Sequence, residues 1–351
     1  MSSLIQRFPN NPILRPSQVT PLHPDLEVAC VLNPAAFEYQ GRVGLLLRVA
    51  ERPSPVAGRR RAIVRIGGGL EMVEDEILPG SKDTDSRAFE LNGKTYLSTL
   101  SHLRLAWSDD GIHFEVAPGP FLQGDTAYEE YGVEDPRVWE EAGVFWITYT
   151  AVSPMGVTVM VASTRDWKSF ERHGVAFAPH NKDVALFSLP DSGRRYALHR
   201  PCAQGFGLGG LDIWLAEGTD WTHWGNHQCI ARTRPGCWDE QRIGAGAAPI
   251  LTEQGWLCIY HGANRDSRYC LGALLLDLKD PSMVLARSKE PLMSPEKDYE
   301  TRGFFGNVVF TNGHVVKGDV IHMYYGSADE YVCGADLTIS GVLKSLEADG
   351  C

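Results

Sequence analysis

Short runs of apolar residues recur along the chain, and turns that carry Gly, Asn or Asp separate them. Apolar and polar positions alternate within each run, which is typical of antiparallel strands. Residues 133–163 give a complete example, in which VEDPRVWEEAGVFWITYTAV is followed by VTVMVAS. Similar units of three strands occupy residues 183–216, 246–276 and 307–335. The pattern therefore predicts an all-β protein built from repeated antiparallel units.

A further unit begins at residues 30–48, where only the first two strands are contiguous, and we expect its third strand at His102–Ser108. Three units are followed by a polar hairpin with an aromatic residue. These hairpins contain Asp110–Phe114, Asp166–Phe170 and Asp220–Trp224. The strand count per unit then approaches four, as in a propeller blade. The alternative is a β-sandwich with coincidental spacing, and we expect no long helix in either case.

The chain has 351 residues, of which 43% are hydrophobic and 22% charged, as in ordinary globular proteins. Acidic residues outnumber basic residues by 44 to 33, which gives a formal net charge of −11. That excess argues against a nucleic-acid-binding protein, because such proteins need a basic surface. We expect a single propeller domain over residues 1–351, with a polar, Gly- and Arg-rich insertion at about 53–85.

The N-terminal segment lacks the pattern of a signal peptide, and the apolar runs are too short to span a membrane. None of the eight cysteines forms a CxxC pair or stands near histidines at zinc spacing. We therefore expect a cytoplasmic protein with free thiols, no membrane association and no bound metal.

In a propeller the first strand of each blade lines the central channel, so polar residues there converge. The candidates in first strands are Asn33, Glu134, Asp135, Arg137, Lys182, Asp183 and Asn307. The candidates at the ends of second strands are Arg48, His199, Arg200, Tyr260, His261, Tyr324 and Asp329. Charged residues within apolar strands are costly unless they are paired or bind a ligand. Their repeated placement predicts one site on the axis.

Asp135 stands in GVEDPR, between an apolar approach and a proline. A buried carboxyl group in such a place has a raised pKa and can act as a general acid. The alternative is a structural role, in which Asp135 caps the turn or pairs with Arg137. The basic residues near the axis predict an anionic ligand, most simply phosphate. The alternative is that these basic residues have a structural role and form ion pairs, for instance Lys182 or Arg200 with Asp183.

Eight segments carry a resemblance to a known family. They are NPAAF…LLLRVAER, SHLRLAWSDDGIHF, GVEDPRV, NKDVALF, YALHRP, WDEQRIGAGAAPI, GWLCIYHGA and YYGSAD. In this order they resemble glycoside hydrolase family 130, from about Asn10 to Leu337. This family contains inverting β-mannoside phosphorylases and some β-1,2-mannosidases, and its fold is a five-bladed β-propeller. The resemblance is greatest to members that act on β-1,2-linked mannose.

The resemblance implies roles for individual residues. Asp135 is the implied catalytic acid, which in related phosphorylases passes its proton through the 3-hydroxyl of the bound mannose. The implied phosphate ligands are Arg48, Lys182, His199, Arg200, Tyr260 and His261. The implied sugar contacts are Asn33, Arg104, Glu134, Asp183, Glu240 and Asp329.

One acid facing several cations favours reversible, inverting phosphorolysis of β-mannosides to α-mannose 1-phosphate, because phosphate is itself the nucleophile. An inverting hydrolase needs a second carboxylate to activate water. Glu240 is the candidate for that role, and otherwise it contacts the acceptor sugar or solvent. The alternatives are a β-1,2-mannosidase of the same fold and a non-catalytic carbohydrate-binding propeller. We expect inorganic phosphate as co-substrate and no cofactor, and the resemblance allows a homo-oligomer.

Overall fold

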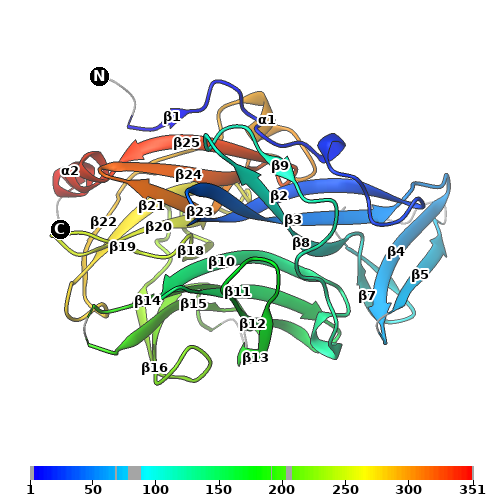
Figure 1. Cartoon of the computed structure of the whole chain (residues 1–351), viewed down its shortest axis with the longest axis horizontal. Helices are drawn as coiled ribbons and strands as arrows, with labels where there is room; N and C mark the ends of the chain where they lie inside the picture. The colour runs from blue at the N-terminus through cyan, green and yellow to red at the C-terminus, as the bar shows by residue number, and fades with distance from the viewer. Residues whose placement is uncertain (1–3, 68, 78–87, 191, 203–207, 350–351) are drawn as a thin grey trace.

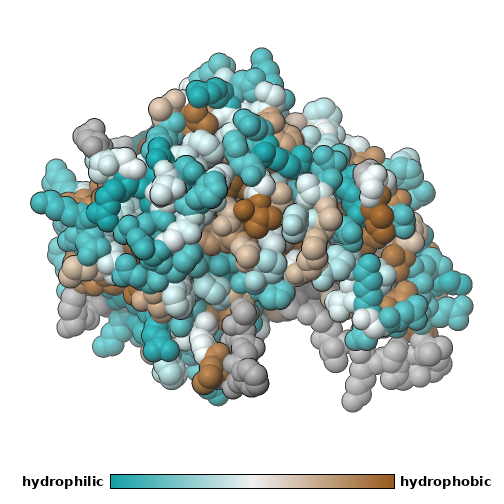
Figure 2. Space-filling model, turned by 90° about the horizontal axis from the view of Figure 1, so that it is seen from below, coloured by the Kyte–Doolittle hydropathy of each residue, from teal (hydrophilic) through white to brown (hydrophobic). Residues whose placement is uncertain are grey.

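The computed structural model describes residues 4–67, 69–77, 88–190, 192–202 and 208–349. Its main strands form five antiparallel sheets that are arranged as the blades of a propeller (Figure 1). This arrangement confirms the predicted all-β, five-bladed fold, and the β-sandwich alternative is wrong. Most of the face seen in Figure 2 is hydrophilic, with apolar residues in separate patches.

The strands of each blade follow one another outward from the axis, except that the chain's first strand completes the last blade. Blade 1 contains β2 (Leu26–Tyr39), β3 (Arg42–Pro53), β8 (Leu100–Ser108) and β9 (Glu115–Val116). Blade 2 contains β10 (Val133–Glu141), β11 (Val144–Ser153), β12 (Gly156–Thr164) and β13 (Glu171–Phe177). Blade 3 contains β14 (Asn181–Ser188), β15 (Arg195–Pro201), β16 (Ile213–Gly218) and β17 (Trp224–Ala231). Blade 4 contains β18 (Arg242–Ala245), β19 (Ile250–Leu251), β20 (Trp256–Ala263), β21 (Tyr269–Leu276) and β22 (Val284–Arg287). Blade 5 contains β23 (Val309–Lys317), β24 (Val320–Ser327), β25 (Tyr331–Thr338) and β1 (Gln6–Arg7).

The ring is closed by strands from the two ends of the chain. Gln6 pairs with Asp336 and Arg7 with Ala335. Arg7 also donates to the buried Glu300 at 2.7 Å, which fixes the short β1 strand in place. The helical segments are η1 (Pro16–Gln18), η2 (Ala127–Glu129), α1 (Asp298–Thr301) and α2 (Ile339–Asp349). No helix among the described residues has the length and apolar character needed to cross a membrane.

The predicted outer hairpins join the third strand to the fourth in blades 1 to 3, as the sequence pattern indicated. In each hairpin an aspartate accepts hydrogen bonds from main-chain N–H groups two and three residues later. Asp277 makes the same contacts in blade 4. Such turns stabilise tight reversals, which explains why Asp recurs at this position. The predicted third strand at His102–Ser108 is confirmed as β8, which pairs with β3.

The inner strands of blades 1 to 3 share a feature that shapes the axis. Asn33, Asp135 and Asp183 have positive φ angles of 44°, 48° and 57°. Each lies where the register of its strand shifts against its neighbour, so each marks a β-bulge. Asn and Asp tolerate this left-handed conformation better than other non-glycine residues, and bulges re-aim side chains beside functional sites. The bulges therefore place three polar side chains at equivalent points around the channel.

Two hairpins occupy the segment between β3 and β8. They consist of β4 (Arg59–Ile66) with β5 (Gly69–Glu76), and β6 (Ala88–Leu91) with β7 (Lys94–Leu97). The first hairpin projects from the propeller at the right of Figure 1. Residues 68 and 78–87 of this segment lie outside the described part of the chain. The second hairpin lies beyond the residue 85 at which we expected the insertion to end.

Candidate active site

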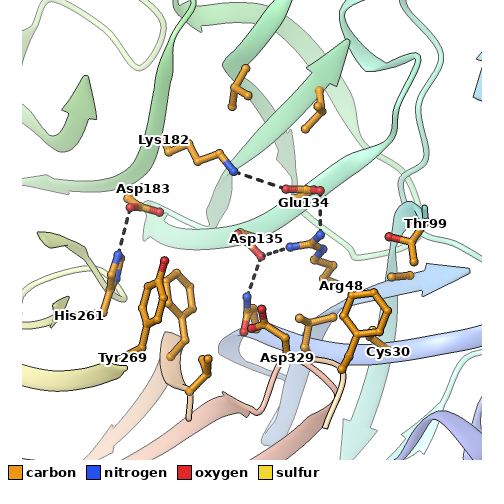
Figure 3. A pocket seen from close by; sticks show the side chains of 18 of the residues that line it. Cys30, Arg48, Thr99, Glu134, Asp135, Lys182, Asp183, His261, Tyr269 and Asp329 are labelled. Carbon is orange, nitrogen blue, oxygen red and sulfur yellow. Dashed lines mark hydrogen bonds and ion pairs between the residues drawn. The ribbon is translucent and has the colours of Figure 1, made fainter. Parts of the chain in front are cut away.

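A cavity of about 370 Å³ lies on the propeller axis, and Figure 3 shows 18 of the side chains around it. This volume falls within the range of small-molecule sites, about 300–1,000 Å³. All five blades and the insertion contribute to its wall. The polar lining residues are Asn33, Arg48, Thr99, Glu134, Asp135, Lys182, Asp183, Arg200, Arg242, His261, Tyr269 and Asp329. The axial site predicted from the inner strands therefore exists as a cavity.

Asp135 lies in the middle of the cavity and is held from two sides (Figure 3). Its Oδ1 atom accepts from Asn33 Nδ2 at 2.9 Å and from Arg48 Nη1 at 3.1 Å. The adjacent Glu134 accepts from Arg48 Nη2 at 2.7 Å, and its other oxygen lies 3.7 Å from Lys182 Nζ. Arg137 reaches Asp135 only at its main-chain carbonyl, and its other hydrogen bonds go to Asp183, Ala245 and Gly246. The predicted alternative, in which the Asp135 carboxylate pairs with Arg137, is therefore not observed. The carboxyl group of Asp135 is thus fixed in orientation while it lines the cavity.

The pKa of Asp135 lies below its ordinary value, against the raised pKa that we expected. Burial pushes this pKa up, but the positive charges of Arg48 and Lys182 and the hydrogen bond from Asn33 push it down further. The apolar approach in the sequence was therefore a misleading signal, because the cations lie on other strands. The carboxyl group is ionised at neutral pH until something offsets those cations.

One end of the cavity, which we call the cationic end, is formed by Arg200, Arg242, His261 and Tyr269 around Asp183. Asp183 lies 2.7 Å from Arg200 Nη1, 3.1 Å from Arg137 Nη2 and 3.2 Å from His261 Nε2. The expected ion pair between Arg200 and Asp183 is thus present, and both residues still line the cavity.

The charges at the cationic end do not balance. Burial lowers the pKa of His261, with Asp183 acting in the opposite direction, so its ring is neutral near pH 7. Arg242 makes its side-chain hydrogen bonds with Tyr269 and Gln241 instead of a carboxylate. Among the described lining residues of this end, the guanidinium groups of Arg200 and Arg242 therefore face the single carboxylate of Asp183, and Arg137 contacts Asp183 from behind the lining. Binding of an anion would offset this excess of positive charge.

Some buried polar atoms of the cavity have no hydrogen-bond partner within the described structure. They include Asn33 Oδ1, Arg200 Nε and His261 Nδ1. Buried polar groups in native proteins are almost always satisfied, so such atoms indicate a polar ligand or ordered water. A ligand with both hydroxyl groups and anionic oxygens matches this mixture of acceptors and donors.

Two of the predicted phosphate ligands do not reach the cavity. Side chains alternate along a strand, so His199 and Arg200 point to opposite faces of β15, and Tyr260 and His261 to opposite faces of β20. The His199 ring packs on Phe177 at 4.8 Å between centroids and bonds to Asn181 and His227. The Tyr260 hydroxyl donates to Asp239 at 2.8 Å inside blade 4. The prediction for His199 and Tyr260 was wrong because it treated each dipeptide as one unit.

Two predicted sugar contacts also lie outside the cavity lining. Arg104 stands on β8, the third strand of blade 1, and its Nη1 donates to the carbonyl of Thr20 at 2.9 Å. Glu240 accepts from the Gly236 N–H at 3.2 Å and lies 3.4 Å from Arg265 Nε. It therefore supports its own loop and is not the additional axial carboxylate that we considered. Of the axial candidates without a role implied by the resemblance, Arg137, Asn307 and Tyr324 do not line the cavity either, and the remaining predicted site residues do.

Arg242 and Tyr269 at the cationic end were not among the residues predicted from the sequence. We placed the first strand of blade 4 at residue 246, but the inner strand β18 begins at Arg242. Ala88, Leu97 and Thr99 were also overlooked, and they bring the β6–β7 hairpin to the opposite part of the cavity, which we call the insertion end. Arg242 could have been identified from its place at the end of the WDEQR segment, directly before a short apolar strand.

Comparison with known proteins gives consistent matches. The Glyco_hydro_130 family model, described as beta-1,4-mannooligosaccharide phosphorylase, matches residues 90–348. A β-1,2-mannobiose phosphorylase of Listeria innocua serovar 6a is 41% identical over 355 residues, which cover 98% of this chain and 99% of that protein. A 1,2-β-oligomannan phosphorylase of Thermoanaerobacter sp. strain X514 is 37% identical over 250 residues, which cover 70% of this chain and 82% of that protein.

A solved structure gives the same result. The β-1,2-mannobiose phosphorylase from Listeria innocua in complex with β-1,2-mannobiose has a TM-score of 0.92 to this chain at 40% identity. The match covers 99% of this chain and 100% of that one. The likeness therefore extends over the whole propeller and the insertion.

Proposed function

The chain belongs to glycoside hydrolase family 130, and on that basis we propose that it cleaves β-1,2-linked mannosides with phosphate to give α-mannose 1-phosphate. The β-1,2 linkage is supported by the names of the two relatives and of the solved structure described above. The phosphorolytic reaction is supported by the unbalanced charge at the cationic end. That imbalance is the observation that carries the proposal, because inorganic phosphate carries one or two negative charges near neutral pH.

In this proposal phosphate binds at the cationic end, where Arg200 and Arg242 present guanidinium groups and Lys182 adds a flexible ammonium group. Guanidinium groups match phosphate oxygens in pairs, which gives orientation as well as affinity. The mannose to be transferred lies between this phosphate and the insertion end, beside Asp135 and Asn33. The phosphate is then held on the α face of the sugar, opposite the leaving acceptor.

The reaction forms one bond and breaks one bond at the anomeric carbon. A phosphate oxygen bonds to that carbon from the α face while the bond to the glycosidic oxygen breaks. The proton from the Asp135 carboxyl group ends on the departing oxygen, and the family resemblance implies that it travels through the 3-hydroxyl of mannose. Because Asp135 is ionised in the free protein, its proton must arrive together with the substrates. Phosphate binding explains this proton uptake, because the negative charge of phosphate offsets positive charge that lowers the pKa of Asp135.

Hydrolysis by the same fold is less well supported. An inverting hydrolase needs a second carboxylate about 6.5–9.5 Å from the acid, free to activate water. Glu240 does not line the cavity, and Glu134 and Asp183 are each held by two or more basic groups. We further propose that the enzyme needs neither metal nor cofactor and acts in the cytoplasm. The seven free thiols of the described cysteines fit a reducing compartment.

The test is to incubate the enzyme with β-1,2-mannobiose in the presence and absence of phosphate. We expect consumption only with phosphate, and α-mannose 1-phosphate as the product when the anomer is resolved by NMR. Release of mannose at the same rate without phosphate would establish the mannosidase instead. The Asp135→Asn variant serves as the matched control, and it should be folded and inactive.

A further inference from the structure

The ammonium group of Lys182 is held more loosely than the guanidinium groups near it. The side chain of Lys182 is 29% exposed, against 17% for Arg48 and 9% for Arg200. Its Nζ atom lies 3.7 Å from Glu134 Oε2, which is close enough for an ion pair but too long for a hydrogen bond. Lys182 therefore touches its carboxylate without being fixed by it.

The main chain of Lys182 stands beside the cationic end, although its ammonium group points elsewhere. Lys182 and Arg200 are directly opposite each other on β14 and β15, and both line the axial cavity. Opposed residues of an antiparallel pair have Cβ atoms about 4.5–5.5 Å apart, and like charges in such positions repel each other. In Figure 3 the side chain of Lys182 extends toward Glu134. The position of the ammonium group thus relieves its repulsion with Arg200.

Glu134 is held in place from its other side. It is only 6% exposed, and its Oε1 atom accepts from Arg48 Nη2 at 2.7 Å. Arg48 is anchored in turn, because its Nε donates to the hydroxyl group of the buried Ser101 at 3.0 Å. Of the two partners in the ion pair, Lys182 is therefore the one that can move, on a flexible four-carbon chain.

A phosphate ion at the cationic end changes the balance of forces on Lys182. Its negative charge offsets the positive charge of Arg200, so the repulsion that keeps the ammonium group away from Arg200 is reduced. Its oxygens also offer Lys182 the charge-assisted hydrogen bonds that Glu134 does not provide at 3.7 Å. Glu134 and phosphate therefore compete for the same ammonium group.

We propose that Glu134 is a positioning residue that keeps Lys182 in a resting position and releases it when phosphate binds, and that it thereby lowers the affinity for phosphate. This inference rests on the function proposed above and replaces the sugar contact that the resemblance implied for Glu134. Lys182 is also one of the cations that lower the pKa of Asp135. Its movement toward phosphate weakens that influence, so binding of phosphate prepares Asp135 to hold a proton.

The experiment measures the Kd of inorganic phosphate by isothermal titration calorimetry for wild type, Glu134→Gln, Lys182→Met and the double variant. Glu134→Gln should bind phosphate about 5–10-fold more tightly, an effect between those of exposed and buried ion pairs. In the Lys182→Met background the same change should have almost no effect, because the ammonium group is absent. A merely structural role of Glu134 would weaken phosphate binding instead.

Asp329→Asn is the matched control for the general effect of removing a negative charge. Asp329 lines the same cavity, on the other side of Asp135 from Lys182 (Figure 3). Any gain in phosphate affinity from Asp329→Asn should therefore be the same with and without Lys182. The difference between the two carboxylates isolates the competition for the ammonium group.

Turnover and crystallography provide further measurements. Glu134→Gln should lower the KM for phosphate and also lower kcat, because Arg48 loses one of the two carboxylates that hold it beside Asp135. In crystals soaked with phosphate, Lys182 Nζ should bond to the ion and lie farther than 3.7 Å from Glu134 Oε2. Unchanged or weaker phosphate binding by Glu134→Gln, or an equal gain with and without Lys182, would overturn the inference while leaving the proposed function intact. Phosphate that binds only outside the axial cavity would overturn both.

Discussion

Binding of a dianion to the axial cavity should be accompanied by uptake of a proton on Asp135. In the free protein, burial raises the pKa of Asp135, but Arg48, Lys182 and Asn33 lower it below its ordinary value. An anion bound at the cationic end, where we also propose a contact with Lys182, offsets part of this positive charge and raises the pKa of Asp135 again. Between the lower and the higher pKa, the complex holds one proton more than the free protein.

The size of the effect follows from the distances. Arg48 Nη1 lies 3.1 Å from Asp135 Oδ1, so at an effective dielectric constant of about 20 this contact stabilises the carboxylate by about 5 kcal/mol. The two negative charges of a bound dianion act on the same carboxylate in the opposite direction. We therefore expect net uptake of protons when the anion binds in mildly acidic buffer.

Sulfate is the appropriate probe, because it keeps two negative charges at this pH and does not itself titrate. Isothermal titration calorimetry in two buffers of different ionisation enthalpy measures the protons taken up. The Asp135→Asn variant should bind sulfate with no proton uptake. Binding of sulfate to the wild type without proton uptake would refute the electrostatic argument. Equal uptake by wild type and variant would assign the proton to another residue.

Asp135→Asn should lower phosphorolytic turnover by about 10²–10⁴-fold while the protein stays folded, as checked by steady-state kinetics and circular dichroism. Arg242→Gln should raise the KM for phosphate much more than the KM for the mannoside, since it removes a charge at the cationic end; equal changes in both constants would contradict this role. Synthesis from α-mannose 1-phosphate should proceed in excess chelator, and a strict requirement for one divalent ion would show that the site was misinterpreted. Burial, together with the charge of His227, lowers the pKa of His199 to about 3, so the unfolded chain binds a proton there below about pH 6.5 that the folded chain does not. The free energy of unfolding should therefore fall by about 1.4 kcal/mol per pH unit below that point through this residue, and His199→Gln should reduce the slope in urea unfolding experiments.

The inner-strand residues were predictable because the chain repeats. Asn33, Asp135 and Asp183 stand at equivalent points of units that can be aligned by their turns, and equivalent points of a propeller face one axis. The positive φ angles at these residues favour Asn and Asp over most other side chains. A polar residue inside an apolar run thus marked both the bulge and the site.

The remaining site residues depend on features that the repeat does not encode. Whether His199 or Arg200 faces the axis depends on the register of β15, because a shift of one residue exchanges the two faces of a strand. The composition of the segment does not reveal that register. Arg242 was overlooked because the inner strand of blade 4 is interrupted after Ala245 and departs from the other units. Glu240 could not be placed because its loop is fixed by Asp239, which pairs with Arg234 nearby and with Arg287, which is distant in sequence.

Closure of the ring by the two residues of β1 has a consequence for the protein with substrate bound. The axial cavity takes side chains from every blade, including Asn33 from the first and Asp329 from the turn after β24 in the last. Separating those two blades at the β1–β25 pairing would also pull apart cavity-lining groups that we propose to hold the sugar. A bound mannoside therefore acts as a noncovalent cross-link across the seam of the ring. Its binding energy adds to the barrier against opening, so resistance to proteases should increase with substrate occupancy.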